Sequence, residues 1–127
     1  MFALTLMVAD SSVAQPGFPS KPVRIYTGTA GGSSDIASRL IAQGLTGNLG
    51  QPVIVDARPN VLARETVMKA PPDGYALLLA ANSFYLGPLL RDDALYDPLR
   101  DFAAVTLAIR GSNILVVHPS LPVNSVK

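Results

Sequence analysis

The sequence lacks several residue types, and each absence excludes a class of function. It contains no cysteine, which excludes disulfide frameworks, thiolate zinc sites and cysteine nucleophiles. It contains no tryptophan, and aromatic residues make up only 6%, so we expect no stacking platform for single-stranded nucleic acid. The single histidine, His118, provides too few ligands for a histidine-rich metal site. We therefore expect backbone groups and side-chain hydroxyls to make the functional contacts.

The charge is almost balanced. The chain has ten Lys and Arg residues and nine Asp and Glu residues, which leaves a formal charge of +1. Without a strong field of one sign, neither a nucleic-acid partner nor a polybasic membrane patch is expected. The chain has 127 residues, 49% of them hydrophobic and 15% charged, a composition typical of one folded domain.

The first residues resemble the core of a signal peptide. Residues 1–9 form an apolar run that is far shorter than the ~20 residues a spanning helix needs, so stable membrane insertion is not expected. Ser12-Val13-Ala14 follows with the small-x-small pattern of a cleavage site. A basic stretch is missing before the apolar run, because the first cation is Lys21. We interpret residues 1–14 as a residual signal-peptide-like segment whose start lies upstream, with a buried or frayed N-terminal segment as the alternative.

Short apolar strands alternate with helical stretches in the rest of the chain. The pattern predicts strands at residues 23–27, 53–56, 75–80, 104–109 and 114–117. It predicts a first helix that Ser33 or Ser34 caps and that stops near Gly50, and a second helix at residues 63–70. The first helix carries one apolar stripe, formed by Ile36, Leu40, Ile41, Leu45 and Leu49. This alternation indicates an α/β fold with a mostly parallel sheet flanked by helices.

Ligands bind to parallel sheets of this kind outside the carboxyl ends of the strands. The glycine-rich segment Gly31-Gly32-Ser33-Ser34-Asp35 follows the first strand there, and Asn82-Ser83 follows the third. Free N–H groups at a helix start, with serine hydroxyls beside them, could hold a carboxylate or phosphate. Asp35 would orient the loop or accept a hydrogen bond from a ligand hydroxyl or water. Alternatively, the glycines only make a tight turn and Asp35 only caps the helix.

Nucleotide motifs are incomplete. No lysine follows the glycines as a phosphate-binding P-loop requires. Thr27-Gly28-x-x-x-Gly32 resembles the glycine motif of short-chain dehydrogenases, and Asp56 ends the second strand where a ribose-binding acid would sit. However, Ser34 replaces the third glycine and no Tyr-x-x-x-Lys pair is present. An NAD(P)-binding fragment of such an enzyme stays an alternative. Arg39 and Arg58 could meet a carboxylate ligand, although a solvated surface role is favoured.

A series of motifs in fixed order carries a clearer resemblance. These are Phe18-Pro19-Ser20-Lys21-Pro22-Val23-Arg24-Ile25, Gly31-Gly32-Ser33-Ser34-Asp35, Leu49-Gly50-Gln51-Pro52-Val53, Pro72-Asp73-Gly74-Tyr75, Tyr96-Asp97-Pro98-Leu99-Arg100-Asp101-Phe102 and Val116-Val117-His118-Pro119-Ser120-Leu121-Pro122. Together they resemble the Bug family, the extracytoplasmic solute receptors of tripartite tricarboxylate transporters.

The resemblance implies a periplasmic binding-protein-like fold of type II, with two α/β lobes that close on a small organic acid. The carboxylate would be held at the cleft by two loops, which here are Gly31, Gly32, Ser33, Ser34 and Asp35, and Asn82 and Ser83. Such a receptor works in the periplasm, passes its ligand to membrane permease subunits, and needs neither a catalytic residue nor a metal or cofactor.

The chain departs from the family pattern in three respects. Its first loop is one residue short, with Tyr26-Thr27-Gly28-Thr29-Ala30 in place of a more apolar, Pro-containing stretch. The family usually carries a Gly-Ala-Gly-Gly-like stretch after the Arg-Pro that is here Arg58-Pro59, whereas this chain reads Asn60-Val61-Leu62-Ala63-Arg64. By the resemblance, nearly all of the second lobe is expected to be missing: residues 18–110 would form the first lobe and residues 111–127 the crossover into a truncated second one. A non-functional remnant of a receptor is a further alternative.

Overall fold

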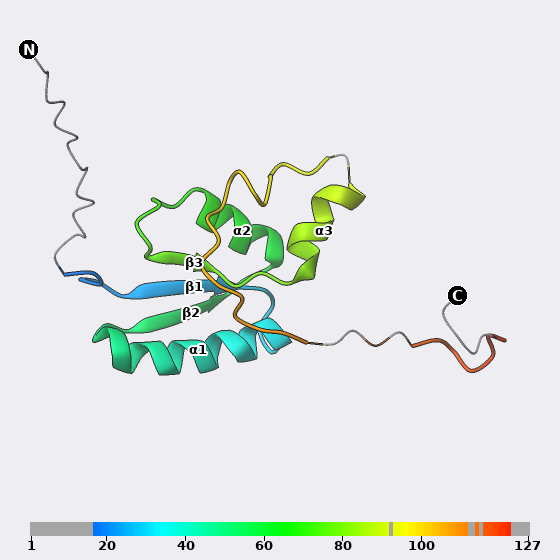
Figure 1. Cartoon of the computed structure of the whole chain (residues 1–127), viewed down its shortest axis with the longest axis horizontal. Helices are drawn as coiled ribbons and strands as arrows, with labels where there is room; N and C mark the ends of the chain where they lie inside the picture. The colour runs from blue at the N-terminus through cyan, green and yellow to red at the C-terminus, as the bar shows by residue number, and fades with distance from the viewer. Residues whose placement is uncertain (1–16, 92, 112–113, 115, 123–127) are drawn as a thin grey trace, which may run out of the picture.

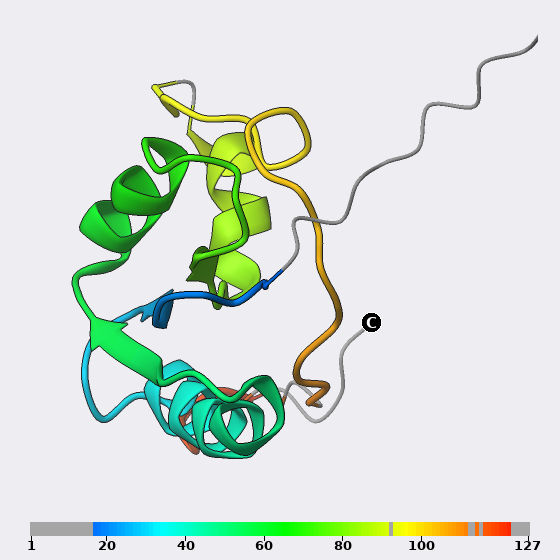
Figure 2. The same cartoon turned by 90° about the vertical axis from the view of Figure 1, so that its left-hand side faces the viewer.

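The computed structural model describes residues 17–91, 93–111, 114 and 116–122, which form an α/β fold. Its elements alternate along the chain: β1 (Val23–Thr27), α1 (Ser33–Leu49), β2 (Val53–Ala57), α2 (Asn60–Met68), β3 (Ala76–Leu78) and α3 (Asn82–Leu90). Helix α1 covers one face of the sheet and α2 covers the other (Figure 1, Figure 2). The predicted α/β class with a parallel sheet is therefore confirmed. The signal-peptide-like residues 1–14 lie outside the described residues.

Strand β1 is the centre of the sheet. The strand order is β2-β1-β3, and both neighbours run parallel to β1. Val23 pairs with Val53 on one side, and Arg24 pairs with Ala76 on the other. A central parallel strand is covered on both faces, which explains why β1 buries Ile25 and why its apolar, β-branched sequence predicts the correct bounds.

Helix α1 packs with a face different from the predicted one. Its buried residues are Asp35, Ser38 and Ala42, which repeat at helical spacing along one side. The predicted apolar stripe is used only in part: Ile36 and Leu40 are 56% and 66% exposed, whereas Ile41, Leu45 and Leu49 are half-buried. Small side chains at the contact let a helix approach a sheet closely, and here that effect outweighs the apolar periodicity.

The other predicted elements are confirmed with shifted bounds. Strand β2 extends one residue further than predicted, to Ala57, and β3 is limited to Ala76–Leu78. Helix α2 begins at Asn60, directly after Pro59, three residues before the predicted start. Helix α1 ends at Leu49 as predicted, because Gly50 adopts the left-handed conformation with φ +65°. Helix α3 is not predicted from the sequence pattern.

The two strands predicted after α3 are wrong for the described residues. Residues 104–109 are extended but belong to no ladder, and residues 114, 116 and 117 are likewise outside any strand. Val105 and Leu107 are 79% and 69% exposed. The segment runs from the α3 side of the molecule past the sheet to the α1 side instead of lying along a strand (Figure 2). Alternating apolar residues form a strand only where a ladder partner is available.

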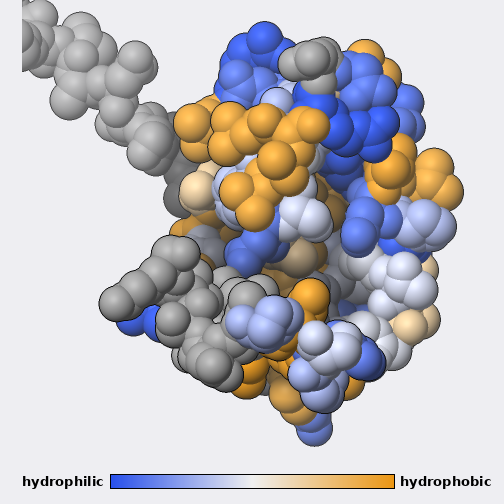
Figure 3. Space-filling model, turned by 90° about the vertical axis from the view of Figure 1, so that its right-hand side faces the viewer, coloured by the Kyte–Doolittle hydropathy of each residue, from blue (hydrophilic) through white to orange (hydrophobic). Residues whose placement is uncertain are grey.

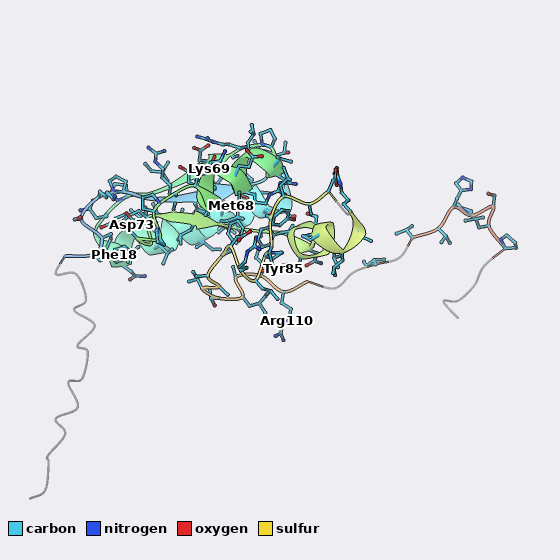
Figure 4. All side chains as sticks on the ribbon, turned by 90° about the horizontal axis from the view of Figure 1, so that it is seen from above. Phe18, Met68, Lys69, Asp73, Tyr85 and Arg110 are labelled. Atoms are coloured by element: carbon cyan, nitrogen blue, oxygen red, sulfur yellow. The ribbon has the colours of Figure 1, made fainter. Side chains whose placement is uncertain are left out.

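This segment makes Arg110 an expected early site of tryptic cleavage. Arg110 is exposed, lies outside any helix or strand, and its side chain points away from the ribbon (Figure 4). Proteases cut locally open chain faster than hydrogen-bonded elements. Brief trypsin digestion followed by mass spectrometry should show cleavage after Arg110 before cleavage after Arg24 in β1 or Arg39 in α1. Earlier cleavage within β1 or α1 would contradict the fold described.

Replacing Thr27, the last residue of β1, with valine is expected to stabilise the fold. Its side chain is fully buried, and Oγ1 has no hydrogen-bond partner among the described residues. Because an unpaired buried hydroxyl is costly, Thr27→Val should raise the free energy of unfolding by about 1 kcal/mol in urea titrations. Thr46→Val is the matched control: this hydroxyl donates to the Ala42 carbonyl at 2.8 Å and accepts from Val53 N–H at 3.1 Å. The control should lose stability, and a loss in both variants would contradict the prediction.

Candidate ligand-binding site

Three helices begin at the carboxyl edge of the sheet, one after each strand (Figure 1). The N-cap residues of α1, α2 and α3 are Gly32, Pro59 and Ala81, and none of them makes a side-chain capping bond. The prediction that Ser33 or Ser34 caps α1 is wrong, because both serines already lie inside the helix. The first-turn N–H groups of all three helices are thus left without a side-chain cap, and the helix dipoles make this edge attractive to an anion.

Asp35 fixes the loop between β1 and α1. Its Oδ2 accepts a hydrogen bond from Gly31 N–H at 2.9 Å, and its Oδ1 lies 3.1 Å from Arg39 Nη2. Gly31 adopts φ +81°, a conformation that a side chain would strain. The Gly31 hydrogen bond, followed by the Arg39 guanidinium, holds the pKa of the Asp35 carboxyl below its ordinary value. Asp35 is 4% exposed, so of the roles considered for it the arrangement favours orientation of the loop over contact with a ligand.

A cavity of about 410 Å³ lies beside α2 and α3 at the carboxyl edge. Figure 3 shows that the molecule is hollowed on this side. Of the predicted site residues, Ser34 from α1 and Ser83 from α3 line this cavity. Gly31, Gly32, Ser33 and Asn82 are exposed near these helix starts but are not among the lining residues. The structure thus joins one residue from each predicted loop in a common cavity.

Sequence reasoning missed the contribution of α2 to this cavity. Asn60, the first residue of α2, lines the cavity beside Gly28. A Cβ atom at Gly28 would overlap the Asn60 side-chain amide, so any side chain at this position would displace that amide. Arg64 and Tyr96 also line the cavity. Asn60 could have been found from the rule that placed the other two loops, because it follows the carboxyl end of β2.

The two arginines considered as ligand contacts are held by neighbouring carboxylates. Arg58 makes a two-pronged contact with Asp56, with Nε–Oδ1 2.8 Å and Nη2–Oδ2 2.7 Å. Arg39 pairs with Asp35, as described above. The Arg58 guanidinium lowers the pKa of Asp56 and occupies both of its oxygens. This pairing leaves Asp56 poorly placed for the ribose contact that a dinucleotide fold needs.

Comparison with known families agrees with this architecture. The sequence model of the tripartite tricarboxylate transporter family receptor matches residues 37–127. A UPF0065 protein of Bordetella pertussis is 33% identical over 97% of this chain, and a UPF0065 protein of Bordetella bronchiseptica is 42% identical over 83% of it. Protein BugT of Bordetella pertussis is 31% identical over 95% of the chain. The chain spans 39%, 32% and 40% of the lengths of these three relatives.

A solved structure shares the fold. The protein described as "Structure of a periplasmic transporter" superposes with a TM-score of 0.61 and 36% sequence identity, over 65% of this chain and 30% of that one. Among the described residues, no helix combines the length and apolar character that crossing a membrane requires. The family match, the relatives and the shared fold agree with the motif series in the sequence. The chain therefore belongs to the tripartite tricarboxylate transporter receptor family, which includes the Bug proteins.

Proposed function

We propose that this chain contributes the first lobe of an extracytoplasmic receptor that captures a small carboxylated solute and performs no catalysis. The observation that carries the proposal is the convergence of α1, α2 and α3, each without a side-chain cap, on one cavity of about 410 Å³. Helix N-termini bind carboxylates through backbone N–H groups and need no basic side chain. Ser34, Asn60 and Ser83 add side-chain donors at the same place.

The proposed binding elements are the loops predicted from the sequence. Ser33 and Ser34 would supply N–H and hydroxyl donors from the start of α1. Gly31 and Gly32, whose N–H groups donate to Asp35 Oδ2 and to the Thr29 carbonyl, would shape the loop and let a ligand approach it. Asn82 and Ser83 would act in the same way from the start of α3. The described cavity lining includes no histidine, and its carboxylates Glu65 and Asp93 are paired with Lys69 and Arg91. His118 lies on a separate exposed turn, where its Nδ1 is 2.7 Å from Ser120 Oγ.

The proposed biological setting follows from the family. The receptor would act in the periplasm after export directed by a segment that includes residues 1–14, and would deliver its ligand to membrane permease subunits. Residues 18–110 would form the first lobe and residues 111–127 would lead into a second. Two-lobe receptors sequester a ligand by closure of both lobes. We therefore expect the 127-residue chain alone to bind its ligand weakly, with a millimolar Kd.

Two-dimensional ¹H–¹⁵N NMR titration of the 127-residue chain tests the proposal at such affinities. Acetate, succinate, citrate, glutamate and benzoate should be compared with neutral acetamide and with chloride at equal ionic strength. Saturable shifts of the Ser33, Ser34 and Ser83 amides with one or more carboxylates, and not with acetamide or chloride, are expected. If no carboxylate shifts these amides, or if NADH does so instead, the proposal is wrong.

A further inference from the structure

Two guanidinium groups line the cavity, and they differ in their partners. Arg91 is bound by Asp93 through two parallel contacts, with Nε–Oδ1 3.0 Å and Nη2–Oδ2 2.9 Å. Among the described residues, Arg64 makes no ion pair and no side-chain hydrogen bond. Glu65, beside it in α2, pairs with Lys69 instead at 3.8 Å. Arg64 thus brings a positive charge to the cavity that the described carboxylates do not neutralise.

Arg64 is held in place by an aromatic ring. Its Cζ lies 3.9 Å from the centroid of the Tyr96 ring, a stacking distance for a guanidinium. Tyr96 itself is 8% exposed, donates from Oη to the Phe84 carbonyl at 2.7 Å, and stacks on the Phe84 ring with the two centroids 5.4 Å apart. A Cβ atom at Gly87 would lie 3.0 Å from the Tyr96 hydroxyl, so α3 leaves the room that this ring needs.

Stacking leaves the polar edge of the guanidinium available. The five N–H donors of arginine point outward in the plane of the group, whereas Tyr96 covers one face. A side chain already held on a ring loses less conformational entropy when it binds a ligand than a freely moving one. Arg64 is therefore prepared to donate two parallel hydrogen bonds to a planar anionic group in the cavity.

The position of Arg64 relative to the helix starts sets the geometry of this contact. Arg64 follows Asn60 by four residues in α2, so both side chains lie on the same face, about 6 Å apart along the helix axis. Both line the cavity. A ligand whose carboxylate meets the helix N-termini near Asn60 would present its other end to Arg64.

We propose that Arg64, held on the Tyr96 ring, determines ligand specificity by binding a second anionic group of the solute. This inference rests on the proposed function, since it assigns the far end of the same ligand. It selects solutes with two carboxylates several carbons apart over those with one.

The test compares glutarate with its monoamide, 5-amino-5-oxopentanoate, because the two have nearly the same shape and differ by one charge. Their Kd values are measured by NMR titration of the 127-residue chain as wild type, Arg64→Met, Arg64→Lys and Arg110→Met. We expect wild type to bind glutarate at least about tenfold more tightly than the monoamide. Arg64→Met should weaken glutarate binding by about 10- to 100-fold and change monoamide binding by less than about twofold. Arg110→Met, which removes an exposed cation that does not line the cavity, should keep the wild-type ratio.

The outcomes distinguish a failure of the specificity proposal for Arg64 from a failure of the proposed receptor function. If both ligands bind and Arg64→Met weakens them equally or not at all, Arg64 is no specificity determinant, although the receptor function stands. If neither ligand nor any other carboxylate shifts the amides of wild type, the proposed function fails and this inference fails with it. If Arg64→Met does not fold, Arg64→Lys takes its place in the test. This variant keeps the charge but loses the planar fork, so it should retain only part of the glutarate preference. A wild-type ratio in a folded Arg64→Lys variant would overturn the two-bond contact.

Discussion

Replacing Asp35 with alanine is expected to lower the melting temperature by roughly 10 °C, the largest stability loss that we expect from a single substitution in the candidate site. The change removes the acceptor of the Gly31 N–H bond and the partner of Arg39. It also leaves a small void, because Asp35 is buried against the rest of the fold. The loop that carries Gly31 and Gly32 would lose its fixed shape, so carboxylate binding should weaken together with stability.

Asp35→Asn is the matched control, because its side-chain oxygen can still accept from Gly31 while the charge is lost. It should lower the melting temperature by about half as much as Asp35→Ala. Since the pKa of Asp35 is lower in the folded than in the unfolded chain, its charge stabilises the fold at neutral pH. That contribution decreases once the pH falls below about 4 and disappears as the pH falls through the folded value.

The pH dependence distinguishes this explanation from simple damage to packing. Other carboxyls, including Asp56 and Asp73, also have lowered pKa values, so the acid sensitivity of wild type alone says little about Asp35. The informative quantity is the difference in melting temperature between wild type and Asp35→Asn. It should be largest near about pH 7 and shrink toward about pH 3. A difference that stays constant over this range would show that the charge of Asp35 contributes nothing.

The features that could be predicted from the sequence are those that local interactions determine. Strand β1 is apolar and β-branched, Gly50 provides the left-handed residue that ends α1, and strand–helix alternation implies parallel pairing. The same alternation places the carboxyl ends of β1 and β3 at one edge of the sheet, which is why Ser34 and Ser83 could both be predicted to lie near one ligand. These inferences need only neighbouring residues and the geometry of parallel sheets.

The features that could not be predicted depend on contacts between distant segments. Arg64 and Tyr96 are 32 positions apart, and nothing local to either residue indicates that they stack. The buried face of α1 is set by how closely the helix approaches the sheet, which favours Ser38 over Leu40. Residues 104–109 have the alternation of a strand but lie outside the ladder. Periodicity reports which faces are apolar, and tertiary packing decides which of them are used.

The second large effect is expected at Gly28, where even a methyl group should disturb the cavity. A Cβ atom at this position would overlap the side-chain amide of Asn60, which lines the cavity. Gly28→Ala should therefore displace Asn60 and weaken carboxylate binding by about tenfold, the size expected when one hydrogen bond to a charged group is lost. Gly44→Ala is the matched control, because a Cβ there meets nothing within 4 Å and glycine is unfavourable inside a helix. It should raise the free energy of unfolding by about 0.5–1 kcal/mol and leave binding unchanged.

A double-mutant cycle identifies the contact that is responsible. If Gly28→Ala acts by collision with Asn60, the substitution should cost much less in an Asn60→Ala background, where the amide is absent. Additive losses in the double variant would show that Gly28 matters for another reason, such as the course of the chain after β1. The positive-φ glycines of the described chain include Gly31 but not Gly28, so backbone strain is not a competing explanation at this position. The shape of the cavity at the start of α2 thus depends on Gly28, which directly follows β1. The cycle measures the coupling between Gly28 and Asn60 through the Kd for succinate.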